Sequence, residues 1–209
     1  LDQDMECARR PDGTLDKICV YGAVSGHDLH YDIGGNNARA KTTGSHWLVG
    51  IKGKLNQAKE NDIFGSAFVE AGWGNIDEHS YWAKGHGDTH YYGLGLTARF
   101  RQNEGTFKGI YSEANIKAGR TSTNFTSNLR DASGTYAGYD KGATYYGAGI
   151  GVGYLWALNQ NYNLDISARY QWMHLKGFNA AIVGDPYHFD DLDSHRTRIS
   201  GRLNYTSDP

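Results

Sequence analysis

Residues 162–174, YNLDISARYQWMH, decide the fold class of this chain. Successive side chains of an extended chain point to opposite sides. As far as residue 171, one side of this stretch would carry Asn, Asp, Ser, Arg and Gln residues. The other side would carry Tyr162, Leu164, Ile166, Ala168, Tyr170 and Trp172. This uninterrupted alternation predicts a β-strand with one apolar face and one polar face.

The same two-residue period recurs along most of the chain. It is present in residues 18–30, 47–55, 63–73, 89–100, 110–118, 143–158 and 196–205, and it is weakest in the first of these. Together with residues 162–174, these stretches predict eight strands of about 10 to 15 residues. Such strands are long, because typical strands have about 5 or 6 residues.

The connections between these strands are expected to alternate in length. Long connections are expected at 31–43, 76–88, 121–142 and 175–195, and short ones at 57–61, 102–106 and 159–161. Such alternation is typical of membrane β-barrels, which have short periplasmic turns and longer outer loops.

Aromatic residues on the apolar face gather near both ends of the expected strands. Those near the long connections are Trp47, Trp73, Tyr92, Tyr146 and Trp172, and those near the short turns are Phe100, Trp156, Tyr162 and Tyr205. We interpret them as two aromatic belts at two lipid–water interfaces. Ordinary aromatic residues at strand ends are the alternative interpretation.

Composition excludes several classes of protein. The 209 residues include 21 Lys and Arg against 23 Asp and Glu, a net charge of −2, which argues against a nucleic-acid partner. Mean hydropathy is −0.63, and no apolar run approaches the roughly 18 residues of a membrane helix. A membrane barrel stays compatible, because its strands are apolar on only one face.

Charged residues occupy the polar face of the expected strands. They are Glu70, Arg99, Glu113, Lys117, Asp165, Arg169, Arg198 and Arg202. Because charges that face lipid near the middle of a membrane cost about 2–4 kcal/mol each, we expect this face to line the lumen. The lumen is then either a hydrated passage or an interior filled by salt bridges.

Glycines share the same expected face. They are Gly93, Gly95, Gly147, Gly149, Gly151 and Gly153. The spacing GAGIGVG is not the GxGxxG of dinucleotide-binding sites, so no such cofactor is expected. These positions either leave space inside a barrel or allow aromatic residues of neighbouring strands to pack over them.

Candidate metal and catalytic sites are weak. All nine histidines lie near the expected long connections, including the segments HGDTH and HFDDLDSH, but their spacing matches no zinc or EF-hand motif. No GxSxG or Cys–His pattern is present. We therefore expect no metal, no cofactor and no enzyme activity. Cys7 and Cys19 either pair in an oxidising compartment or remain thiols.

Five motifs carry a family resemblance. GSAFVEAGWGNID, GDTHYYGLGLTARF, TYYGAGIGVGYLW, NLDISARYQWMH and FDDLDSHRTRISGRLNY occur in that order. They resemble the C-terminal β-barrel of bacterial autotransporters, the type V secretion translocator. The resemblance implies an all-β, antiparallel transmembrane barrel in the outer membrane of a Gram-negative bacterium. It also implies a pore and anchor through which an N-terminal passenger reaches the cell surface.

The resemblance also implies partners. They are outer-membrane lipid, the barrel-assembly machinery, periplasmic chaperones and the passenger domain of the same precursor. Some members of the family cleave their linker with acidic residues in the lumen, but no motif singles out Glu70, Glu113 or Asp165 for that role.

The family barrel has twelve strands, whereas this sequence predicts about eight. We therefore expect an incomplete barrel over residues 18–205, an N-terminal lead-in at 1–17 and a truncated end at 206–209. One alternative is a stand-alone, surface-exposed outer-membrane barrel, an adhesin or structural protein without a passenger. Another is a soluble lipocalin-like barrel, which would need an apolar interior and which the aromatic belts disfavour.

Overall fold

The computed structural model describes residues 18–33, 38–56, 58–81, 83–159 and 161–205. In these ranges the chain forms ten β-strands: β1 (Ile18–Ile33), β2 (Ala38–Lys54), β3 (Asn61–His79), β4 (Lys84–Gln102), β5 (Ile110–Arg130), β6 (Tyr136–Ala157), β7 (Tyr162–Leu175), β8 (Phe178–Ile182), β9 (Asp185–Phe189) and β10 (Leu192–Tyr205). None of the described residues belongs to a helix long and apolar enough to cross a membrane. The expected lead-in at 1–17, the expected end at 206–209 and Cys7 lie outside the described residues.

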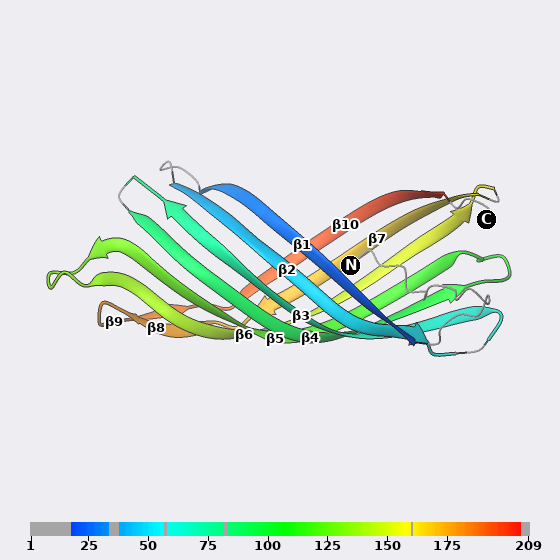
Figure 1. Ribbon diagram of the computed structural model, residues 1–209, viewed down its shortest axis with the longest axis horizontal. Coiled ribbons are helices and arrows are strands. Elements are labelled where there is room, and N and C mark those ends of the chain that lie inside the picture. The colour runs from blue at the N-terminus through cyan, green and yellow to red at the C-terminus, as the bar shows by residue number, and fades with distance from the viewer. Residues whose placement is uncertain (1–17, 34–37, 57, 82, 160, 206–209) are drawn as a thin grey trace.

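Eight of the strands form one antiparallel sheet in the order β1-β2-β3-β4-β5-β6-β7-β10. Strands β1 to β7 therefore follow one another in sequence order, as in a meander, and β10 lies beside β7. The sheet curls into a half-barrel (Figure 1). Among the described strands, β1 pairs with β2 alone and β10 pairs with β7 alone, so these two strands form the edges. The expected fold class, an incomplete antiparallel barrel of about eight long strands, is confirmed.

The register keeps the two faces of the sheet separate. Leu164 lies opposite Leu203, and Val69 lies opposite both Val49 and Leu94. Among the described strand pairs, the register shifts only close to the β5–β6 turn, between Thr126 and Arg130. Because a slip of one residue would exchange the faces, this register keeps the exposed apolar residues, such as Val49 and Val69, on one face and charged residues such as Glu70 on the other.

The expected lengths of the connections are wrong. The strands of the large sheet have 14 to 22 residues, and most of the segments 31–43, 76–88 and 121–142 belong to strands. The β3–β4 connection covers only 80–83, and the β5–β6 connection only 131–135. The apolar alternation stops beyond the aromatic residues, but backbone pairing continues there, for example where Asp77 lies opposite His86.

The expected long connection at 175–195 contains a hairpin of its own. Strands β8 and β9 pair through a turn in which Val183 and Gly184 both have positive φ, 54° and 89°, as a type I′ turn requires. The rings of Phe178 and Phe189 stack with centroids 4.7 Å apart, and both contact Tyr139 of β6. The hairpin therefore packs against the extended end of β6.

Burial differs sharply between the two faces of the sheet. Side chains on a concave face converge as the sheet curls, and this face carries the buried aromatic and aliphatic residues Leu48, Phe64, Phe68, Tyr111 and Tyr145. Apolar side chains on the convex face stay exposed, by 83% for Val24 and 63% for both Leu94 and Ile150. A contiguous exposed apolar surface of this kind marks an interface with lipid or with another protein.

Candidate functional site

The concave face carries an ion pair at its centre, between Glu70 of β3 and Lys117 of β5. The Lys117 Nζ lies 3.1 Å from a Glu70 carboxylate oxygen, and the Tyr145 hydroxyl donates a hydrogen bond of 2.9 Å to the same oxygen. Glu70 is only 4% exposed. A buried carboxylate with these two donors is well compensated, because its charge is both paired and hydrogen-bonded.

A second carboxylate, Glu113 of β5, lies between two arginines. Arg99 of β4 donates to one of its oxygens at 3.0 Å, and Arg169 of β7 lies 2.5 Å from the other. Side-chain exposure is 12% for Glu113 and 15% for each arginine. The concave face therefore carries a half-buried triad with an excess of one positive charge.

Two further carboxylates lie toward the end of the short turns. Asp62 of β3 pairs with Lys54 of β2 and accepts a hydrogen bond of 2.6 Å from Arg101 of β4. Asp165 of β7 accepts a hydrogen bond of 2.8 Å from the Tyr111 hydroxyl of β5. The sequence pattern did not single out four members of this network: Lys54, Asp62, Arg101 and Tyr111. Only their position on the polar side of alternating strands could have suggested them.

Glycines explain why side chains two strands apart can touch. Neighbouring strands lie about 4.8 Å apart, so a bridge from β5 to β7 must cross β6. Gly151 of β6 lies opposite both Glu113 and Arg169, and Gly153 lies opposite both Tyr111 and Ser167. Of the two interpretations of the glycines, the structure supports packing over them, because neighbouring side chains cover these positions.

Side chains cover three of the other predicted glycines in the same way, Gly93, Gly95 and Gly149, whereas Gly147 lies against backbone. Gly93 and Gly95 on β4 lie opposite Glu70 and Lys117, respectively, and let that pair meet across the strand. A Cβ at Gly149 would lie 2.4 Å from Gln171, and one at Gly147 would lie 2.7 Å from the Trp172 carbonyl. Paired side chains therefore line the concave face and lie over the glycine backbone of the sheet.

Replacing Gly93 with alanine is expected to lower the free energy of unfolding by about 1–3 kcal/mol. The added Cβ would lie 2.2 Å from the Tyr145 hydroxyl and 2.8 Å from the Ala118 carbonyl, so it would push Tyr145 away from Glu70. Urea titration in lipid vesicles, followed by tryptophan fluorescence, measures the effect. Gly201→Ala is the matched control, because no atom lies within 4 Å of its Cβ; equal losses for both variants would contradict the argument.

Arg198 and Arg202, the remaining predicted charges, lie on edge strand β10. Their Cα partners on β7 are Arg169 and Asp165, so they share the concave face with the other predicted residues. Both side chains are exposed. The structure thus brings Glu70 to Lys117 and Glu113 to Arg99 and Arg169, while Asp165 meets Tyr111.

The predicted belt residues all lie on the convex face, in two groups that are separated along the strands. In the first group, Trp47 and Tyr92 both lie opposite Ala71. The ring centroids of Tyr146 and Trp172 are 5.6 Å apart. In the second group, the rings of Tyr162 and Tyr205 contact at 5.0 Å. Their role as membrane belts stays a prediction.

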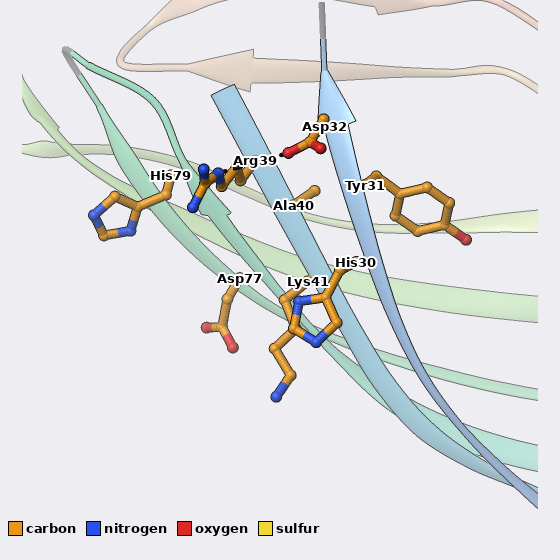
Figure 2. A pocket seen from close by; sticks show the side chains of 8 residues that line it. All are labelled: His30, Tyr31, Asp32, Arg39, Ala40, Lys41, Asp77 and His79. Carbon is orange, nitrogen blue, oxygen red and sulfur yellow. Dashed lines mark ion pairs between the residues drawn. The ribbon is translucent and has the colours of Figure 1, made fainter. Parts of the chain in front are cut away.

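The strand ends beyond the first aromatic group carry histidines and carboxylates. A shallow cavity of about 160 Å³ opens there, and Figure 2 shows Arg39 and Asp32 facing each other across neighbouring strands, 3.6 Å apart. Its lining is mostly polar or charged: His30, Tyr31, Asp32, Arg39, Ala40, Lys41, Asp77 and His79. Within the described residues, no group of three or more His, Cys, Asp or Glu side chains is arranged to hold a metal ion.

The hydrogen bond with Asp77 raises the pKa of His86 above its usual value. The two side chains are 2.7 Å apart and both are exposed. A pKa that folding raises adds stability below the unfolded pKa, and this is lost as pH rises through the folded value. Asp77→Asn is expected to return the His86 pKa toward its ordinary value in an NMR titration. An unchanged pKa would contradict this assignment.

Comparisons with known proteins agree on the fold. No protein-family model and no curated protein matches the sequence. The beta domain of the Bordetella autotransporter BrkA superposes with a TM-score of 0.70 and 14% identity, covering 91% of this chain and 72% of that one. The translocator domain of autotransporter NalP from Neisseria meningitidis gives 0.60 and 16%, covering 92% and 63%.

A third structure, the outer membrane protease OmpT from Escherichia coli, gives a TM-score of 0.55 and 12% identity, covering 91% of this chain and 79% of that one. At these identities the likeness concerns the fold. The chain therefore has the fold of autotransporter β-domains and related outer-membrane barrels, as the five motifs predicted.

Proposed function

We propose that this chain is part of an autotransporter translocator, a barrel in the outer membrane of a Gram-negative bacterium. The proposal rests on one observation: a sheet with the fold of two autotransporter β-domains has a continuous apolar convex face and a charged, ion-paired concave face. Such a sheet fits a protein that meets lipid outside and a polar cargo inside. The cargo would be a passenger on the N-terminal side of the same precursor.

Lipid would cover the convex face between the two aromatic groups. Val49, Val69, Leu94, Ile116 and Ile150 would then contact acyl chains, and the aromatic rings at each end would lie at the level of the lipid headgroups. Backbone groups in lipid must be satisfied within the protein, and the long paired strands satisfy this condition over most of the sheet. Insertion would use the outer-membrane assembly machinery and periplasmic chaperones.

The concave face would form part of the passage. Its carboxylates are neutralised by nearby cations, so a polypeptide moving along it would meet fixed, already paired charges. Such a wall is hydrophilic without offering an isolated buried charge that would hold the cargo tightly. The proposed role is therefore guidance and anchoring, with no chemical step assigned to Glu70, Glu113 or Asp165.

Epitope insertion tests the proposed topology. Gly134, in the β5–β6 turn, and Gly105, in the β4–β5 turn, both have positive φ, and no atom lies within 4 Å of a Cβ at either position. In the full-length protein, antibody should reach an epitope at Gly134 on intact cells. An epitope at Gly105 should become accessible only after the outer membrane is permeabilised. Equal accessibility would overturn the topology, and recovery in the soluble fraction would overturn the location.

A reporter fused ahead of residue 1 tests the transport role separately. If the protein is a translocator, external protease should remove the reporter from intact cells. A reporter that stays protected in cells whose Gly134 epitope is exposed would favour the second candidate, a stand-alone surface barrel. The likeness to OmpT, which is named as an outer membrane protease, is the observation that favours this second candidate.

A further inference from the structure

Two cationic residues lie on either side of Thr144 of β6, close to the first aromatic group. Arg120 of β5 is the Cα partner of Thr144 on one side. On the other side, the backbone N–H of Lys176 donates a hydrogen bond of 2.9 Å to the Thr144 carbonyl. This bond continues the β6–β7 register, in which Tyr145 lies opposite Leu175, by one residue. Arg120, Thr144 and Lys176 therefore form one row across β5, β6 and the end of β7.

This row lies on the convex face, where its apolar part ends. Arg120 is also the Cα partner of Tyr92 on β4, and Thr144 lies two residues from Tyr146 along β6. Directly opposed residues share a face of a sheet, and so do residues two apart along a strand. Arg120, Thr144 and Lys176 are all exposed. Both cations therefore lie at the level of the aromatic rings.

A glycine on β6 makes room for the Arg120 guanidinium. A Cβ at Gly142 would lie 3.3 Å from Nε of Arg120 and 3.4 Å from one of its terminal nitrogens. The guanidinium therefore lies over the β6 backbone, near Thr144. Because neighbouring strands are about 4.8 Å apart, the backbones at Arg120 and Lys176 are about 10 Å apart. A phosphate group beside the Thr144 hydroxyl can contact both of these long side chains.

Within the described part of the chain, no carboxylate forms an ion pair with Arg120 or Lys176. Other cations on the convex face do have such partners: Arg39 of β2, for example, lies 3.6 Å from Asp32 of β1. Asp140, on the same face of β6, lies farther from the apolar part of that face than Arg120 does. The row around Thr144 therefore presents two positive charges that are available to an anion.

The carboxylates that follow β9 are engaged by other groups. Asp193 accepts a hydrogen bond of 2.9 Å from the Trp172 indole and lies 3.0 Å from Nδ1 of His174. Asp191 accepts a hydrogen bond of 2.7 Å from the backbone N–H of Gly177 and lies 3.4 Å from Nε2 of His174. These contacts hold both carboxylates beside His174.

We propose that Arg120, Thr144 and Lys176 bind the phosphate of an anionic lipid headgroup. The inference rests on the proposed membrane location, in which acyl chains cover the apolar convex face and the aromatic rings lie at headgroup level. The guanidinium donates paired N–H groups to phosphate oxygens, and the lysine supplies a compact charge. The Thr144 hydroxyl donates a further hydrogen bond. The site thus selects a lipid by its charge at a defined depth.

Lipid titration tests this site. The full-length protein is reconstituted in phosphatidylcholine vesicles, and energy transfer from its tryptophans to a dansyl-labelled lipid is measured. Labelled phosphatidic acid should bind at least about tenfold more tightly than labelled phosphatidylcholine, because two cations attract the anionic headgroup. This preference should weaken as salt is added.

Charge removal at the row supplies the decisive comparison. The variant R120Q/K176Q should lower the preference for phosphatidic acid to about twofold or less. The matched control R39Q/K41Q removes the same charge from the same face and should keep the preference. The variant R120K/K176R keeps both charges and should also keep it, which separates the loss of charge from a fault in folding.

Four results would each overturn the proposal. They are equal binding of the two lipids, a preference that survives in R120Q/K176Q, a preference lost in R120K/K176R, and an equal loss in R39Q/K41Q. Millimolar inorganic phosphate should leave the labelled lipid bound, because the free ion has no acyl chains to cover the convex face. Displacement by phosphate would overturn the assignment to a lipid. Failure of these tests in a protein that passes the epitope test overturns the lipid site alone, whereas recovery in the soluble fraction overturns the location.

Discussion

Replacing Glu70 with glutamine is expected to lower the free energy of unfolding by about 3–5 kcal/mol. The substitution keeps the size of the side chain but removes the charge that neutralises Lys117, whose side chain is only 22% exposed. A cation left without its partner in a half-buried site carries most of its desolvation cost uncompensated. Urea titration of the protein in lipid vesicles, followed by tryptophan fluorescence, measures the loss.

A double variant separates the ion pair from packing. In E70Q/K117M both charges are absent, so the double variant should recover more than half of the stability lost in E70Q. The coupling energy from the double-mutant cycle should be at least about 1 kcal/mol. If the losses from E70Q and K117M simply add, the two side chains do not stabilise each other and the pair has no energetic role.

Replacing Ile150 with arginine is expected to destabilise the protein in lipid by about 2–4 kcal/mol. Ile150 lies on the convex face of β6, opposite Ala114 and Tyr170, and is 63% exposed. It lies between Tyr146 and Trp156, so an arginine there would be placed near the middle of the proposed lipid-facing zone. Unfolding titrations in vesicles measure the difference.

Asn124→Arg is the matched control, because it introduces the same side chain on the same face. Asn124 lies beyond the first aromatic group, opposite Asp88 and Asp140. Its change in stability should stay within about 0.5 kcal/mol. If Asn124→Arg cost as much as Ile150→Arg, depth in a membrane would not decide the effect, and the lipid-facing assignment would be wrong.

The strand class, the division into two faces and the family likeness follow from the sequence alone. Residues 162–172 alternate without a slip, and an alternation of period two is satisfied by an extended chain with one apolar side. The same alternation of side chains along each strand places Glu70, Glu113 and Arg169 on one face without knowledge of their partners. Their position inside a closed lumen stays a prediction.

The ends of the strands and the β8–β9 hairpin could be located only from the tertiary structure. Beyond the aromatic groups neither face of the sheet is apolar, so the pattern fades although the backbones still pair. The hairpin turn contains Val183 at positive φ, where Asn, Asp or Gly would have signalled a type I′ turn. In the same hairpin as this valine with positive φ, Phe178 and Phe189 pack on Tyr139.

The partners of the charged residues could also be identified only from the tertiary structure. The alternation along one strand assigns a residue to a face of the sheet, but the neighbours of that residue depend on the register of several strands. Glu113 meets Arg169 only because Gly151 lies between them on β6, and Glu70 meets Lys117 across Gly93 and Gly95 on β4. The sequence therefore determined which face is charged, and only the alignment of four or five strands decided which charges neutralise one another.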